Sequence, residues 1–145
     1  MNYKAILSQK GYRLSAPRKQ IIELLEVADV ALSPQQIHNQ LQQNGSALGL
    51  VSVYRTLGLL TELGLVTILY DPQLNPGYVL RTQGHHHHIV CQNCHKALEF
   101  PATNDIDSLV ERVEKQTSFQ VRDHLLQLFG LCPDCKQPDS KGVLS

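Results

Sequence analysis

The sequence lacks the features of a secreted, membrane-bound or broadly basic protein. Its 13 Lys and Arg residues balance 13 Asp and Glu, so the formal net charge of the 145 residues is zero. A neutral total argues against a sequence-independent coat on nucleic acid but permits a local basic face. The start of the chain has no apolar core of a secretory signal, and no apolar run is long enough to cross a membrane. We therefore expect a cytoplasmic protein without a membrane partner.

Cysteine is also scarce, and its placement is informative. All four cysteines lie in the second half as two Cys-x-x-Cys pairs, Cys91 with Cys94 and Cys132 with Cys135. Disulfides would be the first interpretation in a secreted protein, but without a secretion signal a metal site is favoured. Four thiolates fill the tetrahedral coordination of zinc and leave no open position. The pattern predicts a structural Zn²⁺ that joins the two ends of a small domain.

Four consecutive histidines run directly into the first cysteine pair. A purification tag is an alternative, but tags are placed at chain ends and are usually longer. Ile89 and Val90 follow and favour a strand, in which successive side chains point to opposite faces. His85 and His87 should therefore share one face, and His86 and His88 the other.

The face with His85 and His87 is the better candidate for a second metal site. His124 precedes Cys132 by eight residues, so the cysteine site should return it to the same strand. A carboxylate would complete the set, and Asp107 is preferred over Asp105. Imidazoles with one carboxylate suit Zn²⁺, Fe²⁺ or Mn²⁺. In contrast, the sequence offers only weak candidate partners for His86 and His88 on the other face, namely Asp71, Arg81 and His38.

The first half of the chain reads as helices with a slight basic excess. Residues 1–64 carry six basic and four acidic side chains, against seven and nine in the remainder. Apolar spacing predicts a helix over residues 2–10 and another that begins after Ser15, with Arg18 in its first turn. Ser33 and Gln36 form a capping box for a third helix, which Asn44 and Gly45 end.

A fourth helix over residues 50–63 is predicted to have two distinct faces. Its apolar residues recur at helical spacing and should face the core; they are Val53, Leu57 and Leu60. Tyr54 and Arg55 fall on the opposite face, and Arg can bind guanine through two hydrogen bonds. Two strands, 65–70 and 78–82, follow this helix. A helix-turn-helix followed by a hairpin predicts a winged-helix DNA-binding domain over residues 1–82.

Residues 83–145 are predicted to form a small α/β domain, which makes the whole chain α+β. The histidine strand should pair with a strand at 98–100, a helix should cover 106–117, and a long central strand should cover 119–131. Exposed strand edges invite pairing with a second copy of the chain. The domain is therefore expected to mediate dimerisation.

The motifs together resemble those of the ferric uptake regulator family of metal-dependent bacterial repressors. The matching segments are Gly-Tyr-Arg-Leu-Ser-Ala-Pro-Arg (11–18), Val-Tyr-Arg-Thr-Leu (53–57), His-His-His-His-Ile-Val-Cys-Gln-Asn-Cys (85–94) and Cys-Pro-Asp-Cys (132–135). The resemblance implies a homodimer that binds a double-stranded, palindromic operator when a regulatory metal is bound.

Residue roles follow from the same resemblance. It implies structural zinc at the four cysteines, a regulatory site at His85, His87, His124 and Asp107, and a second regulatory site at His86 and His88. Ala31 and Val79 or Leu80 stand where the family often has further ligands of that second site. The expected DNA contacts are Arg18, Ser52, Tyr54 and Arg55.

Two alternative functions remain at the level of the sequence. One is a regulator of the same family that senses peroxide through oxidation of a ligand. The other is a zinc-dependent hydrolase with Glu99 as general base. No nucleophile or substrate-pocket pattern accompanies Glu99, so neither an enzyme nor a small organic substrate is expected.

Overall fold

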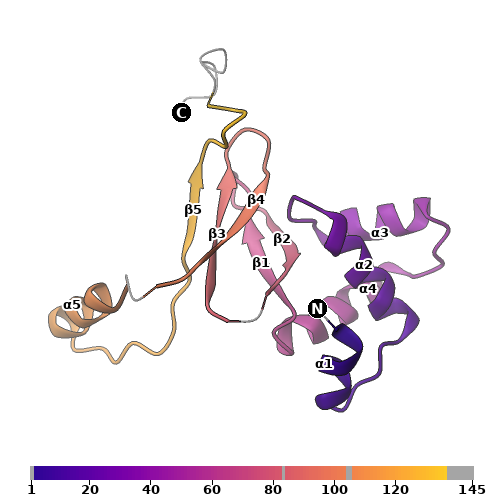
Figure 1. Ribbon diagram of the computed structural model, residues 1–145, viewed down its shortest axis with the longest axis horizontal. Coiled ribbons are helices and arrows are strands. Elements are labelled where there is room, and N and C mark those ends of the chain that lie inside the picture. The colour runs from indigo at the N-terminus through magenta and orange to yellow at the C-terminus, as the bar shows by residue number, and fades with distance from the viewer. Residues whose placement is uncertain (1, 83, 104–105, 137–145) are drawn as a thin grey trace. The chain divides into compact units, whose positions relative to one another are not determined.

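The computed structural model describes residues 2–82, 84–103 and 106–136 (Figure 1). The chain divides into two compact units, Met1–Thr82 and Gln83–Ser145. The elements in chain order are α1 (Tyr3–Gln9), α2 (Ala16–Val27), α3 (Pro34–Gln43), α4 (Leu50–Glu62), β1 (Val66–Tyr70), β2 (Pro76–Leu80), β3 (His86–Cys91), β4 (Ala97–Pro101), α5 (Asp107–Thr117) and β5 (Gln127–Gly130). Among these described residues, none of the helices has the length and apolar character needed to cross a membrane.

The first unit packs its four helices around one apolar core. The most deeply buried side chains come from all four helices and include Leu7, Ile21, Ile37, Val53 and Leu60. Each such side chain contributes roughly 1.5–3 kcal/mol through its removal from water. The core therefore fixes which face of each helix remains in solvent.

Local signals set the helix ends as the sequence predicted. In α3 the Ser33 hydroxyl accepts from the Gln36 N–H at 3.1 Å, and the Gln36 side chain accepts from the Ser33 N–H at 2.8 Å. This reciprocal pair is the predicted capping box. Gly45, with φ of +84°, follows the end of α3 in a left-handed conformation that glycine adopts without strain.

A two-stranded antiparallel hairpin follows α4 and completes the winged helix. Val66 pairs with Leu80 and Tyr70 with Pro76. An isolated bridge between Leu32 and Tyr78 attaches the hairpin to the segment before α3. The prediction of an α+β chain with an N-terminal winged helix is confirmed.

The second unit contains a three-stranded sheet with the histidine strand at its centre. The strand order is β4-β3-β5, with β4 antiparallel and β5 parallel to β3. The predicted long central strand over 119–131 is wrong. The strand spans only Gln127–Gly130 and lies at the sheet edge, because no described strand of this chain lies beside residues 118–126.

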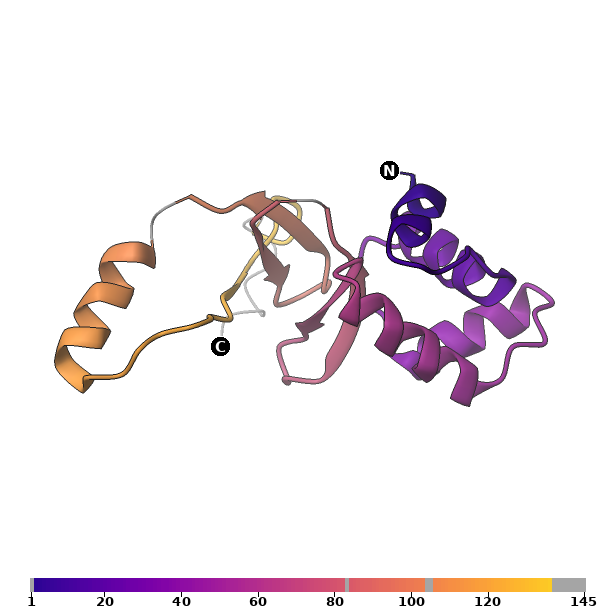
Figure 2. The same cartoon turned by 90° about the horizontal axis from the view of Figure 1, so that it is seen from below.

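Helix α5 stands apart from this sheet, as both views show (Figures 1 and 2). None of its residues is buried. Its apolar side chains, among them Leu109 and Val113, are partly or largely exposed. They form an apolar stripe that, in the described part of the chain, remains in contact with solvent.

The second unit has almost no aliphatic core of its own. Its buried residues, within the described part, are His87, His88, Val90, Cys91 and Cys135. Four of these five are residues that the sequence proposed as metal ligands. A domain of this size rarely folds on such a small apolar core without a metal, a disulfide or a partner chain.

Candidate metal sites and the exposed face of α4

The four cysteines converge from the two Cys-x-x-Cys loops. Their sulfur atoms all lie within 4.8 Å of one another, and the sulfurs of Cys94 and Cys132 are 3.7 Å apart. Tetrahedral zinc with Zn–S bonds of about 2.3 Å requires sulfur–sulfur separations of about 3.8 Å. A disulfide requires about 2.05 Å, and all four thiols are free. The cluster thus has the dimensions of a zinc site.

Hydrogen bonds to sulfur distribute charge unevenly in this cluster. Burial raises the pKa of the Cys91 thiol, but backbone N–H groups of Cys132, Cys94 and Asn93 outweigh that effect and bring the pKa to about 6. The Asn93 amide lowers the pKa of Cys135, yet the hydrogen-bonded Cys132 thiol and burial raise it to about 12. Cys91 therefore loses its proton more readily than Cys135, from which metal binding must displace a proton.

Three imidazoles form the second cluster. His85 and His124, 39 residues apart in sequence, bring their Nε2 atoms to 3.1 Å. The ring of His87 lies 4.9 Å from that of His85 and 5.4 Å from that of His124 between centroids. Tetrahedral zinc with Zn–N bonds of about 2.0–2.1 Å requires nitrogen–nitrogen separations of about 3.4 Å. One nitrogen from each ring lies within 4.8 Å of the others, so small rotations would suffice to share an ion.

The surroundings of His87 favour its neutral imidazole, which is the form that binds metal. His87 is only 8% exposed. Burial lowers the pKa of His87, and the neighbouring His85 and His124 lower it further. Its lone pair is therefore available at neutral pH without prior loss of a proton.

The expected carboxylate ligand is not beside these rings. Asp107 is the first residue of α5, which stands off the sheet, and it is absent from both potential metal clusters in the described part of the chain. The structure does not bring Asp107 into the histidine cluster, and its role as a fourth ligand stays a prediction. The alternative, Asp105, lies outside the described residues.

His86 and His88 also remain outside both clusters. Glu99 of β4 pairs directly with His88 in the sheet register, and its Oε1 lies 3.8 Å from Nδ1 of His86. That oxygen is buried and accepts no hydrogen bond from the residues that the structure describes. Because Glu99 is on the His88 side of the sheet, it faces away from the His85, His87 and His124 cluster, where the hydrolase alternative would need it as a base.

The outward face of α4 is as the sequence predicted. Val53, Leu57 and Leu60 are buried, whereas Tyr54 is 55% exposed and Arg55 is exposed. Ser52 is half-buried. Gly49 precedes the helix and supplies no side-chain cap, so the first N–H groups of α4 remain open to an anion.

Arg18 in the first turn of α2 is held by two neighbours. Its Nη1 donates to the carbonyl oxygen of Arg13 at 2.7 Å, and its guanidinium carbon lies 5.4 Å from the centroid of the Tyr12 ring. A cation over an aromatic face gains roughly 0.5–1 kcal/mol at an exposed site. The contact with Tyr12 was not predicted, because five residues lie between Tyr12 and Arg18 and no periodic pattern connects the two.

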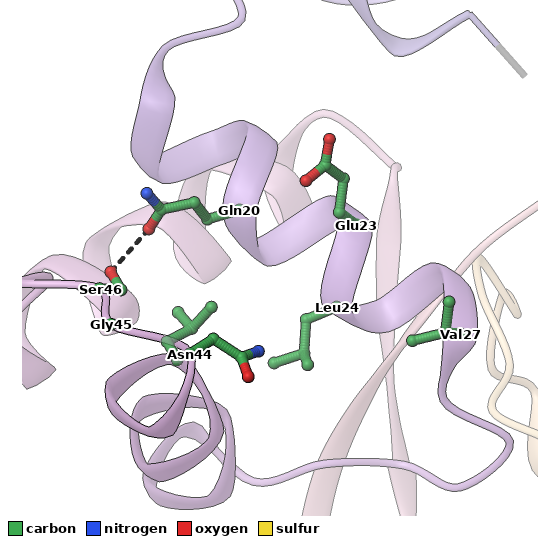
Figure 3. Close-up of a pocket in the computed structure, with 8 residues that line it drawn as sticks. Gln20, Glu23, Leu24, Val27, Asn44, Gly45 and Ser46 are labelled. Carbon is green, nitrogen blue, oxygen red and sulfur yellow. Dashed lines mark hydrogen bonds between the residues drawn. The ribbon is translucent and has the colours of Figure 1, made fainter.

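A depression lies between α2 and the end of α3 (Figure 3). It measures about 340 Å³ and is lined by residues that include Gln20, Glu23, Leu24 and Ser46. Ser46 donates to Gln20 at 2.7 Å, and Glu23 lies 3.9 Å from Lys19. A single carboxylate with a lysine partner offers neither a metal site nor a nucleophile with its base.

The chain thus combines two units. The first has a winged-helix fold, which is typical of DNA-binding proteins, and the second gathers four thiols and three imidazoles that could hold metal ions. The model of the Ferric uptake regulator family matches residues 9–129. The chain belongs to this family.

Individual relatives span nearly the whole chain. The Ferric uptake regulation protein of Campylobacter jejuni is 32% identical, over 96% of this chain and 89% of the relative. The solved Helicobacter pylori regulator, described with three functional metal-binding sites, is 26% identical with a TM-score of 0.64, over 92% of this chain and 89% of that one. A zinc uptake regulator complexed with zinc and DNA shares the fold, with a TM-score of 0.75 at 22% identity over 94% of this chain and 91% of that one.

Proposed function

We propose that this protein is a transcriptional repressor that binds operator DNA as a homodimer when a divalent metal occupies His85, His87 and His124. The four cysteines would hold a structural Zn²⁺. The observation that carries the proposal is the 3.1 Å approach of the His85 and His124 ring nitrogens in a member of this family. The cysteine geometry and the exposed face of α4 support the two other parts.

The coupling of metal to DNA follows from the place of His85 in the chain. His85 lies three residues after Thr82, the last residue of the winged-helix unit. When His85 shares an ion with His87 and His124, the connection between the units loses conformational freedom. The metal-bound protein is then already ordered before it binds the operator. DNA binding therefore no longer includes the entropy cost of ordering this connection. A coupling of about 1–3 kcal/mol is enough for a 5- to 150-fold switch.

DNA recognition is assigned to the first unit. The uncapped start of α4 can receive a phosphate, while Tyr54 and Arg55 on the same helix can reach base edges. Arg18, positioned by Tyr12 and Arg13, adds a backbone contact. Ser52 lies between these groups on the first turn and can donate to phosphate.

The donor set favours zinc among the three candidate metals. Imidazole nitrogens suit Zn²⁺ and Fe²⁺, whereas Mn²⁺ prefers carboxylate and water oxygens. The cluster contains three imidazoles and no carboxylate from the described residues. The order of affinity should therefore be Zn²⁺ above Fe²⁺ above Mn²⁺.

The first prediction tests the switch with the metals in turn. Zn²⁺ should strengthen operator binding by about 5- to 150-fold over protein in a mild chelator that leaves the structural zinc bound, and Mn²⁺ should do so least. His124→Ala should remove this response and retain the weak metal-free binding. Fluorescence anisotropy with labelled operator measures both. Equal affinity of the unmodified protein with chelator and with each metal would refute the switch.

His86→Ala is the matched control for that experiment. It removes a neighbouring imidazole that points to the other face of β3. If His86 and His88 form a second regulatory site with Glu99, this variant shows a reduced maximal response but keeps the first, tighter metal-binding step. An unchanged titration would assign the whole response to His85, His87 and His124.

Dimerisation is proposed through the uncovered apolar surface of the second unit. Leu98, Ile89 and Leu128 form one row across the sheet, since Ile89 pairs with Leu98 on one side and with Leu128 on the other. Leu98 is 63% and Leu128 44% exposed. The same face contains a hollow of about 320 Å³ lined by residues that include Ile89, Leu98 and Leu131. With the exposed stripe of α5, this is more apolar surface than a small monomer usually leaves in water.

The second prediction concerns this surface. Leu128→Glu should convert the dimer to monomer, because a two-fold interface contains each substitution twice and each buried leucine contributes about 1.5–3 kcal/mol. The dimer dissociation constant should rise by roughly 100-fold or more. Sedimentation velocity measures the change. Leu74→Glu, which alters an exposed leucine (68%) in the hairpin of the first unit, should remain dimeric, and a dimeric Leu128→Glu protein would contradict the assignment.

A further inference from the structure

Two hydrogen bonds cross between the cysteine loops in opposite directions. The side-chain amide of Asn93, in the first loop, donates from Nδ2 to the sulfur of Cys135 at 3.2 Å, across 42 residues of sequence. In return, the backbone N–H of Cys132 lies 3.4 Å from the sulfur of Cys91. The two loops are thus joined by hydrogen bonds as well as by their shared ligand geometry.

Asn93 differs from the other donors to these sulfurs. Cys91 receives backbone N–H groups of Cys132, Cys94 and Asn93 itself, and Cys94 receives the backbone N–H of Lys96. The donor to Cys135 is a side-chain amide. No sequence pattern predicts this contact, because asparagine in a short loop is ordinarily a turn residue.

An N–H donor changes a metal-bound thiolate in two ways. It fixes the orientation of the sulfur, and it withdraws electron density from the lone pairs that hold the ion or that attack a competing partner. Cys135 is 8% exposed, whereas Cys94 is exposed. Asn93 is itself exposed, and its side-chain amide reaches the buried sulfur of Cys135 in the other loop.

We propose that Asn93 is a positioning residue of the four-cysteine zinc site: its amide locks Cys135 against the first loop and slows the release of zinc. The inference rests on the proposed structural Zn²⁺. Loss of an outer hydrogen-bond partner of a metal ligand typically costs 10–100-fold in metal affinity, and an effect of that size would separate a long-lived structural ion from an exchangeable one.

The test follows zinc transfer from the purified dimer to a chromogenic chelator. Asn93→Ala should release its zinc about 10- to 100-fold faster than the unmodified protein. Asn93→Asp, which keeps the shape but replaces the donor with a negatively charged acceptor, should be faster still. Gln92→Ala is the matched control, because Gln92 is its exposed neighbour in the loop and bonds Gly130 through its backbone N–H. Its release rate should be unchanged.

A spectroscopic measurement separates the hydrogen bond from simple loosening of the loop. In cobalt-substituted protein, the thiolate-to-cobalt charge-transfer band should move to lower energy in Asn93→Ala, because the sulfur lone pair loses its stabilising donor. An unchanged rate of zinc release from Asn93→Ala would overturn the proposal. Faster release with an unchanged charge-transfer band would also overturn it, because it would indicate lost packing in the loop and not a lost hydrogen bond to sulfur. Unmodified protein that carries no zinc would instead refute the structural zinc itself.

Discussion

Arg55→Ala protein is expected to lose specific operator binding while it keeps its zinc, its dimeric state and its thermal stability. Arg55 is exposed on α4, on the opposite side of the helix from the buried Val53, Leu57 and Leu60. A bidentate contact to guanine contributes about 1–3 kcal/mol, and a symmetric dimer loses it twice. Operator affinity should fall by roughly 30-fold or more, whereas affinity for a scrambled duplex should fall much less.

Anisotropy titrations with operator and scrambled duplex measure this difference directly. Arg112→Ala is the charge-matched control, since Arg112 is an exposed arginine on α5 of the second unit. It should bind operator as the unmodified protein does. Equal losses on both duplexes in Arg55→Ala would mean that Arg55 contacts only the phosphate backbone.

Cys132→Ser is expected to have the largest effect on stability. It removes one thiolate from a cluster whose geometry matches zinc, and structural zinc in small domains contributes an apparent 10–16 kcal/mol to folding. The second unit has only Val90 as a buried aliphatic residue in its described part, so little else can hold it. The variant should purify without the structural zinc and lose the cooperative thermal transition of this unit.

Metal content by mass spectrometry and thermal unfolding by circular dichroism test this expectation. Asp134→Ala changes an exposed residue of the same loop and should retain both zinc and the transition. Cys132→Ser protein with full zinc content and an unchanged thermal transition would contradict a structural role for the cluster.

The parts of the fold that were predictable from sequence are those decided within a few residues. The capping box of Ser33 and Gln36, and the spacing of Val53, Leu57 and Leu60, depend on local geometry that the chain carries with it. Residues 119–131 are different. Their pattern of apolar side chains is compatible with a central strand, but it is equally compatible with an exposed surface that binds another molecule. Only Gln127–Gly130 find a partner strand in this chain.

The candidate sites divide in the same way. The period of two along β3 was enough to separate His85 and His87 from His86 and His88, and the short distance from His124 to Cys132 placed the third imidazole. Asp107 depended on where α5 sits, which no local pattern specifies. Asn93 and Tyr12 act across loops, through single contacts that leave no periodic trace in the sequence.

In the second unit, cysteine and histidine occupy most of the buried positions that leucine and valine would occupy in an ordinary domain. If the four cysteines bind zinc as proposed, folding of the newly made chain requires a supply of zinc. A newly made chain without the ion presents an unfinished second unit to proteases. The lifetime of this chain, and hence its amount, should therefore shorten when zinc is withheld, even if the metal at His85, His87 and His124 is a different ion.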